Sequence, residues 1–144
     1  MIAEDLYNFD IKNIFIMPPI KNTLISHGLF HKLLYSNNLF TSNGLYIKID
    51  YNDTKYLNGR LHYNIDTNVS TIDTIESIEK YILGKINNNN KKIYQKINDQ
   101  FRSGNIKLNN NVSSVLLKIS GLWENENSIG ISYKILSFNN TIDM

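Results

Sequence analysis

A two-residue alternation of apolar and polar side chains near the C-terminus constrains the fold more than any other feature of the sequence. The alternation starts at Val115, stops at the polar residues 124–127 and resumes as far as Ile135. Successive side chains of a β-strand point to opposite faces, so this pattern predicts an antiparallel hairpin. A one-residue slip would move every apolar side chain to the wrong face, so the pattern also predicts the register.

That register has a consequence for two lysines. If Trp123 pairs with Ile129, both apolar sets lie on one side of the hairpin and Lys118 lies opposite Lys134. Like charges directly opposite one another repel mildly. An anion between the two lysines would remove this repulsion.

Four earlier segments add strand signals. Residues 44–51 and 60–65 alternate clearly, and we expect them to form a hairpin with a long loop that ends at the turn dipeptide Asn58-Gly59. Residues 10–17 read as a further strand before two prolines. Residues 28–35 have no clear period and fit either a strand or a helical turn.

Helical spacing follows in the middle of the chain, where isoleucines recur at three- and four-residue steps: Ile72, Ile75, Ile78 and Ile82. Asp73 with Glu76 three residues later fits a capping box, although Thr71 or Thr74 could be the cap instead. Gly84 is a natural end for this helix. Both this helix and the next are short, so they should be stable only when docked.

The second helix is predicted over residues 91–102, from apolar positions at four-residue spacing. The order of elements is therefore several strands, two short helices and a final hairpin. This order predicts a mainly β, OB-like barrel with the helices inserted before the last hairpin. A two-layer α+β sheet fits nearly as well. No repeat or linker divides residues 1–144, so a single domain is expected.

Composition narrows the class of protein. The net charge of +2 is mild, hydrophobic residues make up 42% of the chain, and there is no Cys for disulfides or thiolate sites. Residues 1–10 are acidic, unlike a signal or transit peptide. No apolar run is long enough to span a membrane, so no membrane association is expected. We therefore expect an intracellular protein.

Catalytic signals are weak. No Gly-rich phosphate loop or nucleophile motif is present. Glu124 and Glu126 lie in a predicted turn that looks mobile, so we do not expect it to hold their carboxylates in the fixed geometry that acid–base catalysis needs. His27 and His31 have the spacing of two metal ligands on a helix, but no third ligand lies near them in the sequence. We expect neither an enzyme nor a bound metal or cofactor.

Two stretches carry a resemblance to known proteins: residues 28–51, and residues 103–136 with LLKISGLWENENSIGISYKIL. Together they resemble a small replication-associated family of large nucleo-cytoplasmic DNA viruses. The Gly-x-Trp…Ile-Gly-x-x-Tyr-Lys strand pair is similar to the last hairpin of phage T7-type single-stranded DNA-binding proteins. The resemblance implies an OB fold that coats single strands in replication or recombination. Residues 139–144 carry one acid, so docking of replication partners through a T7-type acidic tail is not expected.

Aromatic and basic side chains are the main functional candidate. Binding a single strand needs rings on which bases stack and cations along the backbone. Tyr46 and Lys48 share the polar face of one predicted strand, and Arg60 and His62 share that of the next. If these strands pair, the four side chains form one patch. An ordinary solvated face is the competing interpretation, and Asp50 on the same face counts against a nucleic-acid groove.

Three residues of the last hairpin complete the candidate site. Trp123 could stack on a base, although the sequence favours a Trp that closes the end of a core. Lys118 and Lys134 could hold a phosphate.

We predict a protein that binds single-stranded DNA or RNA, as a homo-oligomer or with viral replication or virion proteins. A structural or interaction protein, such as a virion component or a subunit of a larger assembly, is the alternative. An apolar rather than a basic surface around Tyr46 would favour it.

Overall fold

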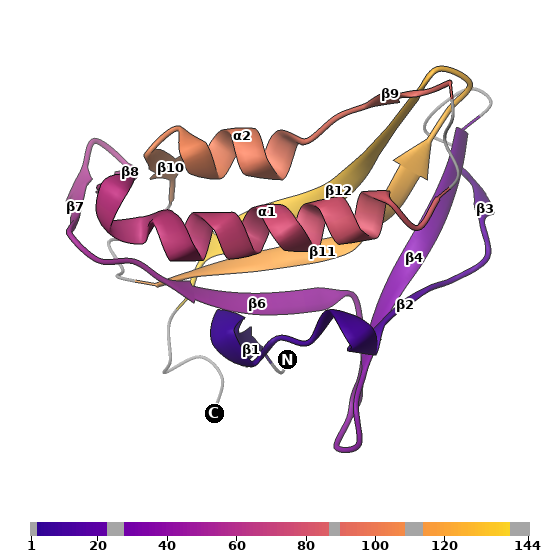
Figure 1. Cartoon of the computed structure of the whole chain (residues 1–144), viewed down its shortest axis with the longest axis horizontal. Coiled ribbons are helices and arrows are strands. Elements are labelled where there is room, and N and C mark those ends of the chain that lie inside the picture. Colours follow the sequence, from indigo (N-terminus) through magenta and orange to yellow (C-terminus); the bar gives the residue numbers. More distant parts are fainter. Residues whose placement is uncertain (1–2, 23–27, 87–89, 109–113, 139–144) are drawn as a thin grey trace.

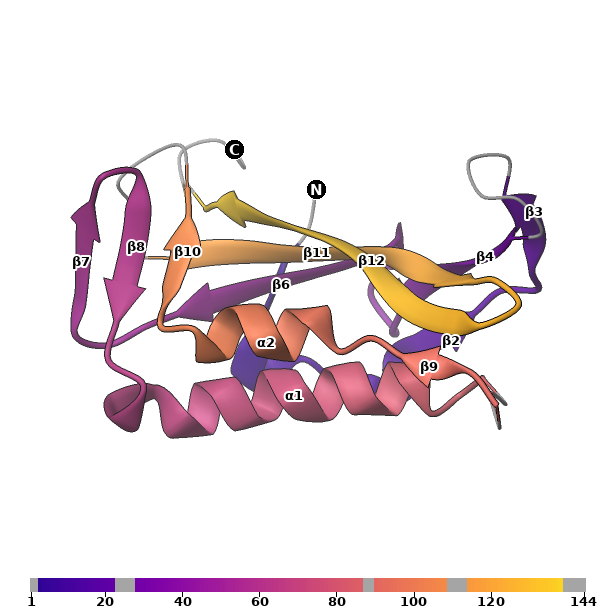
Figure 2. The ribbon, with the colours of Figure 1, turned by 90° about the horizontal axis from the view of Figure 1, so that it is seen from above.

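The computed structural model describes residues 3–22, 28–86, 90–108 and 114–138, and the structural statements that follow refer to these residues alone. Two helices lie against one face of a twisted sheet, and the opposite face carries no helix (Figures 1 and 2). A smaller sheet stands at one end, where the first helix begins and the second ends (Figure 2). The two layers enclose one apolar core.

The first predicted helix is confirmed as α1 (Val69–Leu83), with its four isoleucines buried and Gly84 at its C-cap. The predicted capping box is wrong, because the helix begins before Asp73. Its N-cap residue is Asn68, which is buried and exchanges hydrogen bonds with the backbone of Asn52 instead of capping the helix. The Asn68 side chain therefore makes a long-range contact with Asn52 and is not available to cap α1.

The second helix is shorter than predicted. It is α2 (Lys96–Arg102), and the preceding residues form strand β9 (Lys92–Ile93). The backbone N–H of Tyr94 donates to the carbonyl of Ile129, which holds this segment in an extended form beside the last hairpin. Periodicity alone misses this pairing because the partner strand is distant in sequence. Neither described helix has the length and apolar character that a membrane span requires.

Nine described strands make the main sheet. Its central path runs in the order β1 (Glu4–Asp5), β6 (Leu45–Asp50), β11 (Ser114–Glu124), β12 (Ser128–Ser137) and β9. Strand β4 (Gly28–Ser36) also pairs with β11, and it carries β2 (Ile14–Ile16), β3 (Ile20–Asn22) and β5 (Thr41–Asn43). The mainly β character is confirmed. The described strands form no closed barrel, and helices on one face of an open sheet match the two-layer alternative.

The predicted C-terminal hairpin is confirmed as β11 and β12. Lys118 lies opposite Lys134 and Ile119 opposite Tyr133, as the alternation predicted. On its other side β11 pairs antiparallel with β6, which puts Tyr46 opposite Lys118. Segments from three parts of the sequence therefore meet at Lys118.

A β-bulge changes the second half of this hairpin. The register shifts by one residue at Ser120, so Trp123 pairs with Gly130. The predicted pairing of Trp123 with Ile129 is therefore wrong. Because the bulge adds one residue to β11 only, it also exchanges the faces of that strand. Leu122 is fully buried toward the core, and Trp123 points to the other side of the sheet.

The predicted hairpin between residues 44–51 and 60–65 is wrong. Strand β6 pairs with β1 and β11, whereas the second segment joins a separate three-stranded sheet of β7 (Thr54–Leu57), β8 (Arg60–Tyr63) and β10 (Asn105–Lys107). Asn58 and Gly59 both have positive φ, at 54° and 75°. Such a pair makes the tight turn of a two-residue hairpin. The dipeptide therefore closes a local β7–β8 hairpin rather than the long one.

Candidate functional site

The helix-free face of the main sheet, here called the outer face, gathers aromatic and basic side chains from five strands or their flanks. On β6 the inward residues Leu45, Ile47 and Ile49 are fully buried, so the residues between them point outward. The strand registers then place the following side chains on the outer face: Tyr46 and Lys48 from β6, Phe30 and Lys32 from β4, Lys118 and Trp123 from β11, Lys134 from β12, and Tyr94 beside β9.

Two aromatic rings of the outer face cover strand glycines, whose missing side chains leave room for them. A Cβ atom at Gly121 would lie 2.5 Å from Cζ of Phe30, and one at Gly130 would lie 2.5 Å from Cζ2 of Trp123. A ring that covers a strand glycine in this way stabilises the sheet. Trp123 is half-buried and lies outside the core cluster, so it does not close the core as the sequence favoured.

Two lysines of the outer face lie over aromatic rings. The Nζ atom of Lys118 is 5.7 Å from the centre of the Tyr46 ring, and that of Lys48 is 5.2 Å from the Phe138 ring. None of the ion pairs between described residues includes Lys32, Lys48, Lys118 or Lys134. Exposed cation–π contacts contribute only about 0.5–1 kcal/mol. These ammonium groups can therefore still bind an anion.

Acidic residues occur at one end of the outer face. Asp5 lies opposite Lys48 in the pairing of β1 with β6, and Asp50 is exposed and accepts a hydrogen bond from Ser114. The central part, around Lys118, has no carboxylate among the strand residues paired there. The negative charge of Asp50, which counts against a nucleic-acid groove, therefore lies at the end of the outer face near β1 and not at its centre.

Two of the predicted site residues are not brought to this face. Arg60 and His62 lie on β8 in the smaller sheet, and Arg60 donates a hydrogen bond of 2.8 Å to Asn105. Lys55 lies opposite His62, and Lys107 lies opposite Arg60. The single patch predicted from the sequence is thus divided between two sheets.

A partly buried polar cluster lies near the hairpin tip. Nε2 of His31 is 2.6 Å from one carboxylate oxygen of Glu124, and Nζ of Lys91 is 2.6 Å from the other. Desolvation raises the pKa of Glu124, but the hydrogen bonds from Lys91 and His31 outweigh it, so this pKa lies below its ordinary value. Glu124 is therefore a fixed residue at the end of β11, contrary to the expectation of a mobile turn.

The predicted histidine pair does not form a metal site within the described residues. His31 lies on strand β4 rather than on a helix, and its ring contacts Glu124 and the carbonyl of Met17. His27 lies outside the described residues. No group of three potential metal ligands occurs in the part of the chain that the structure describes.

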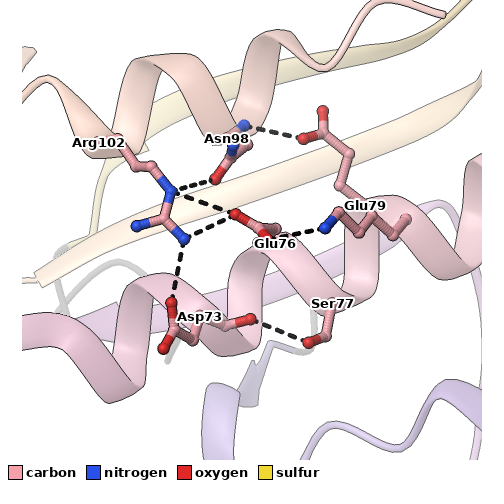
Figure 3. Close-up of polar contacts among 7 residues, drawn as sticks. Asp73, Glu76, Ser77, Glu79, Asn98 and Arg102 are labelled. Carbon is pink, nitrogen blue, oxygen red and sulfur yellow. Dashed lines mark hydrogen bonds and ion pairs between the residues drawn. The ribbon is translucent and has the colours of Figure 1, made fainter.

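The charged residues between the two helices form a separate network (Figure 3). Arg102 of α2 contacts Asp73 at 3.0 Å and Glu76 at 2.6 Å, both on α1. Glu79 of α1 accepts hydrogen bonds from the backbone N–H groups of Ile97 and Asn98 at the start of α2. These contacts dock one helix on the other and leave no open polar site.

Sequence reasoning missed Phe30, Lys32 and Tyr94. A signal was present for the first two, because residues 28–35 alternate once they are read as a strand: His31, Leu33 and Tyr35 are buried, whereas Phe30 and Lys32 are not. Tyr94 could not be found in this way, since its place depends on the pairing of β9 with β12.

Comparison of the chain with protein-family models, curated proteins and solved structures finds no match.

Proposed function

We propose that the protein binds single-stranded nucleic acid across the outer face of its main sheet. One observation carries this proposal. Phe30 and Trp123 cover strand glycines, and Lys32 and Lys118, which have no carboxylate partner among the described residues, line the same hollow as Phe30. Bases of a single strand stack on such rings, and its phosphates bind such cations.

The magnitudes favour modest, salt-sensitive binding. Stacking of one base on a ring contributes roughly 1–3 kcal/mol and tolerates any base. Each phosphate neutralised by a lysine adds about 0.7 to the slope of log affinity against log salt for a single strand. The net charge of +2 is small, so long-range attraction is weak and the local cluster around Lys118 supplies most of the electrostatic term.

The alternative, an interaction protein that buries this face against a partner, is less favoured. Such an interface is depleted in charged residues at its centre, and lysine in particular is rare there. Lys118 and Lys134 lie opposite one another in the middle of the outer face. Leu136 is exposed on the same face but lies nearer its end.

Trp123 provides a direct test because it is the only Trp in the chain. Stacking of a base on the indole should change its fluorescence as a single-stranded oligonucleotide is added at about 50 mM salt. Trp123→Phe keeps a ring and should retain binding in an assay with a labelled oligonucleotide. Trp123→Ala should weaken that binding by about tenfold.

A matched pair of lysine variants locates the cations. Lys118→Gln should lower the affinity and reduce the salt slope by about 0.7. Lys80→Gln removes a lysine from the helix side of the sheet, where it contacts Glu76, and should change neither quantity. Equal effects of the two variants, or no binding by the wild-type protein, would reject the proposal.

A further inference from the structure

The outer face contains a hollow at the point where β11 exchanges one partner strand for another. Its volume is about 350 Å³. The side chains that matter for its chemistry are Phe30, Lys32, Asn43, Tyr46, Lys118 and Ser120. This is a different place from the Trp123 ring, and neither the sequence nor the comparisons pointed to it.

The hollow is a consequence of the way the strands meet. Before the bulge, Ile119 of β11 pairs with Leu45 of β6; after it, Gly121 pairs with Lys32 of β4. Gly44 lies between the two partner strands and has a φ of 92°, a backbone conformation that residues other than glycine rarely adopt. The bulge and this turn divide one edge of β11 between β4 and β6, which do not pair with each other. The backbone N–H of Gly44 donates to the carbonyl of Leu33 in β4, which fixes the turn at the rim of the hollow.

We propose that this hollow is a pocket for one nucleobase of the bound strand, an inference that rests on the proposed function. Phe30 and Tyr46 supply apolar walls for a base. Lys32 and Lys118 stand at the pocket, where they bind the phosphates on either side of that base. A base turned out of a strand is recognised in this way when stacking and hydrogen bonds to its edge occur together.

Asn43 provides the hydrogen bonds to the edge of the base. Its side chain is exposed at the pocket and makes no hydrogen bond to any described side chain or backbone group. A side-chain amide offers two donors and one acceptor, which distinguishes one base from another. Stacking on Trp123 tolerates every base, so the pocket makes the protein prefer some bases over others.

The test compares homopolymers of about ten nucleotides of thymine, cytosine and adenine, at one salt concentration. The wild-type protein should discriminate its best from its worst homopolymer by about tenfold, the range of one good bidentate contact. Asn43→Ala should reduce this ratio to less than about twofold while the protein still binds. Asn38→Ala is the control, since this exposed residue lies outside the pocket and should leave the ratio unchanged.

The outcomes separate the two proposals. If wild-type protein binds all homopolymers equally, or if Asn43→Ala binds and discriminates as wild type does, the base pocket is wrong and the stacking face remains. If wild-type protein binds no homopolymer and its Trp123 fluorescence does not respond, both proposals fall. An oligonucleotide with one abasic position should bind Asn43→Ala and wild type with more nearly equal affinity than the intact one.

Discussion

The two faces of the main sheet use charged residues in opposite ways. On the helix side, Arg102 is paired with Asp73 and Glu76, and Glu76 also contacts Lys80 (Figure 3). On the outer face, Lys118 lies over the Tyr46 ring and Lys48 over the Phe138 ring. The charges of the helix network are paired with one another, whereas Lys118 and Lys134 at the centre of the outer face have no ion-pair partner among the described residues.

This difference shows which charges stabilise the fold and which are free for a ligand. Hydrogen bonds from Lys80 and then Arg102 lower the pKa of the Glu76 carboxyl, and the hydrogen bonds that Arg102 donates to Glu76 and Asp73 raise the pKa of Arg102. Such mutual shifts indicate contacts within the protein itself. Substitutions on the helix side should therefore change stability alone, and those on the outer face should mainly change binding.

The largest effect is expected at Glu79. Burial raises the pKa of this carboxyl, while the backbone N–H groups of Asn98 and Ile97 lower it. Glu79→Ala would leave both donors without a partner at the start of α2, at a cost of about 3 kcal/mol in the free energy of unfolding. Urea denaturation measures this loss.

Two controls accompany that measurement. Glu79→Gln keeps one acceptor and should lose about half as much. Ser77→Ala, on an exposed part of α1, should stay within about 0.5 kcal/mol of the wild type. Oligonucleotide affinity of the folded Glu79→Ala protein should be unchanged, and a tenfold loss of affinity would break the division between the two faces.

A smaller effect, shared between stability and binding, is expected at Gly130. A Cβ atom there would lie 2.5 Å from the Trp123 ring, so Gly130→Ala must displace the indole. Overpacking of this kind costs about 1–3 kcal/mol of stability. The displaced ring should also reduce the affinity for single strands by about tenfold.

A double-mutant cycle separates these two consequences. If Gly130 acts on binding through Trp123, the variant with both Gly130→Ala and Trp123→Ala should bind no more weakly than Trp123→Ala. Additive losses would mean that the glycine contacts the strand by itself.

A pH-dependent effect of about 1–2 kcal/mol is expected at Glu124. Its pKa in the folded protein lies below the ordinary value of 4.5, so the carboxylate contributes stability above that pH and loses it as the pH falls through the folded pKa. At pH 7, Glu124→Gln should be less stable than wild type by about 1–2 kcal/mol. The difference should shrink below pH 4.5; a constant difference down to pH 2 would contradict the linkage.

The smallest effect is expected at Arg60. Because this residue lies on the smaller sheet, its charge is screened from a strand bound across the outer face. Arg60→Gln should change the affinity by less than about twofold, compared with a clear loss for Lys118→Gln. Equal losses of affinity for Arg60→Gln and Lys118→Gln would instead indicate that both sheets contact the bound strand, as the sequence had predicted.

Local pattern was enough for much of the secondary structure. The isoleucine stripe of α1 and the alternation of β6 each depend on one face that must be buried, and both predictions are confirmed. The first half of the last hairpin also follows from alternation, down to the facing lysines Lys118 and Lys134. The candidate site was predicted in part, since Tyr46, Lys48, Lys118, Trp123 and Lys134 share one face.

The rest depended on which strands meet. Alternation alone does not reveal the bulge at Ser120, although a glycine inside a strand, as at Gly121, often marks one. This one extra residue turns Trp123 from the core side to the outer face, and the hollow lies beside the bulge. The partner of β6 could not be read from its own residues, because alternation specifies a buried face but not a neighbouring strand.

Sequence pattern thus determined where α1, β6 and the first half of the last hairpin lie and which side chains each of them buries, since both depend on local periodicity and on the transfer of apolar groups from water. Tertiary structure alone decided that Arg60 belongs to another sheet and that Phe30, Tyr94 and Trp123 share a face with Lys118. The physical reason is that strand pairing is made by backbone hydrogen bonds, which are common to all residues. The choice between possible partners is therefore made by the packing of the whole chain.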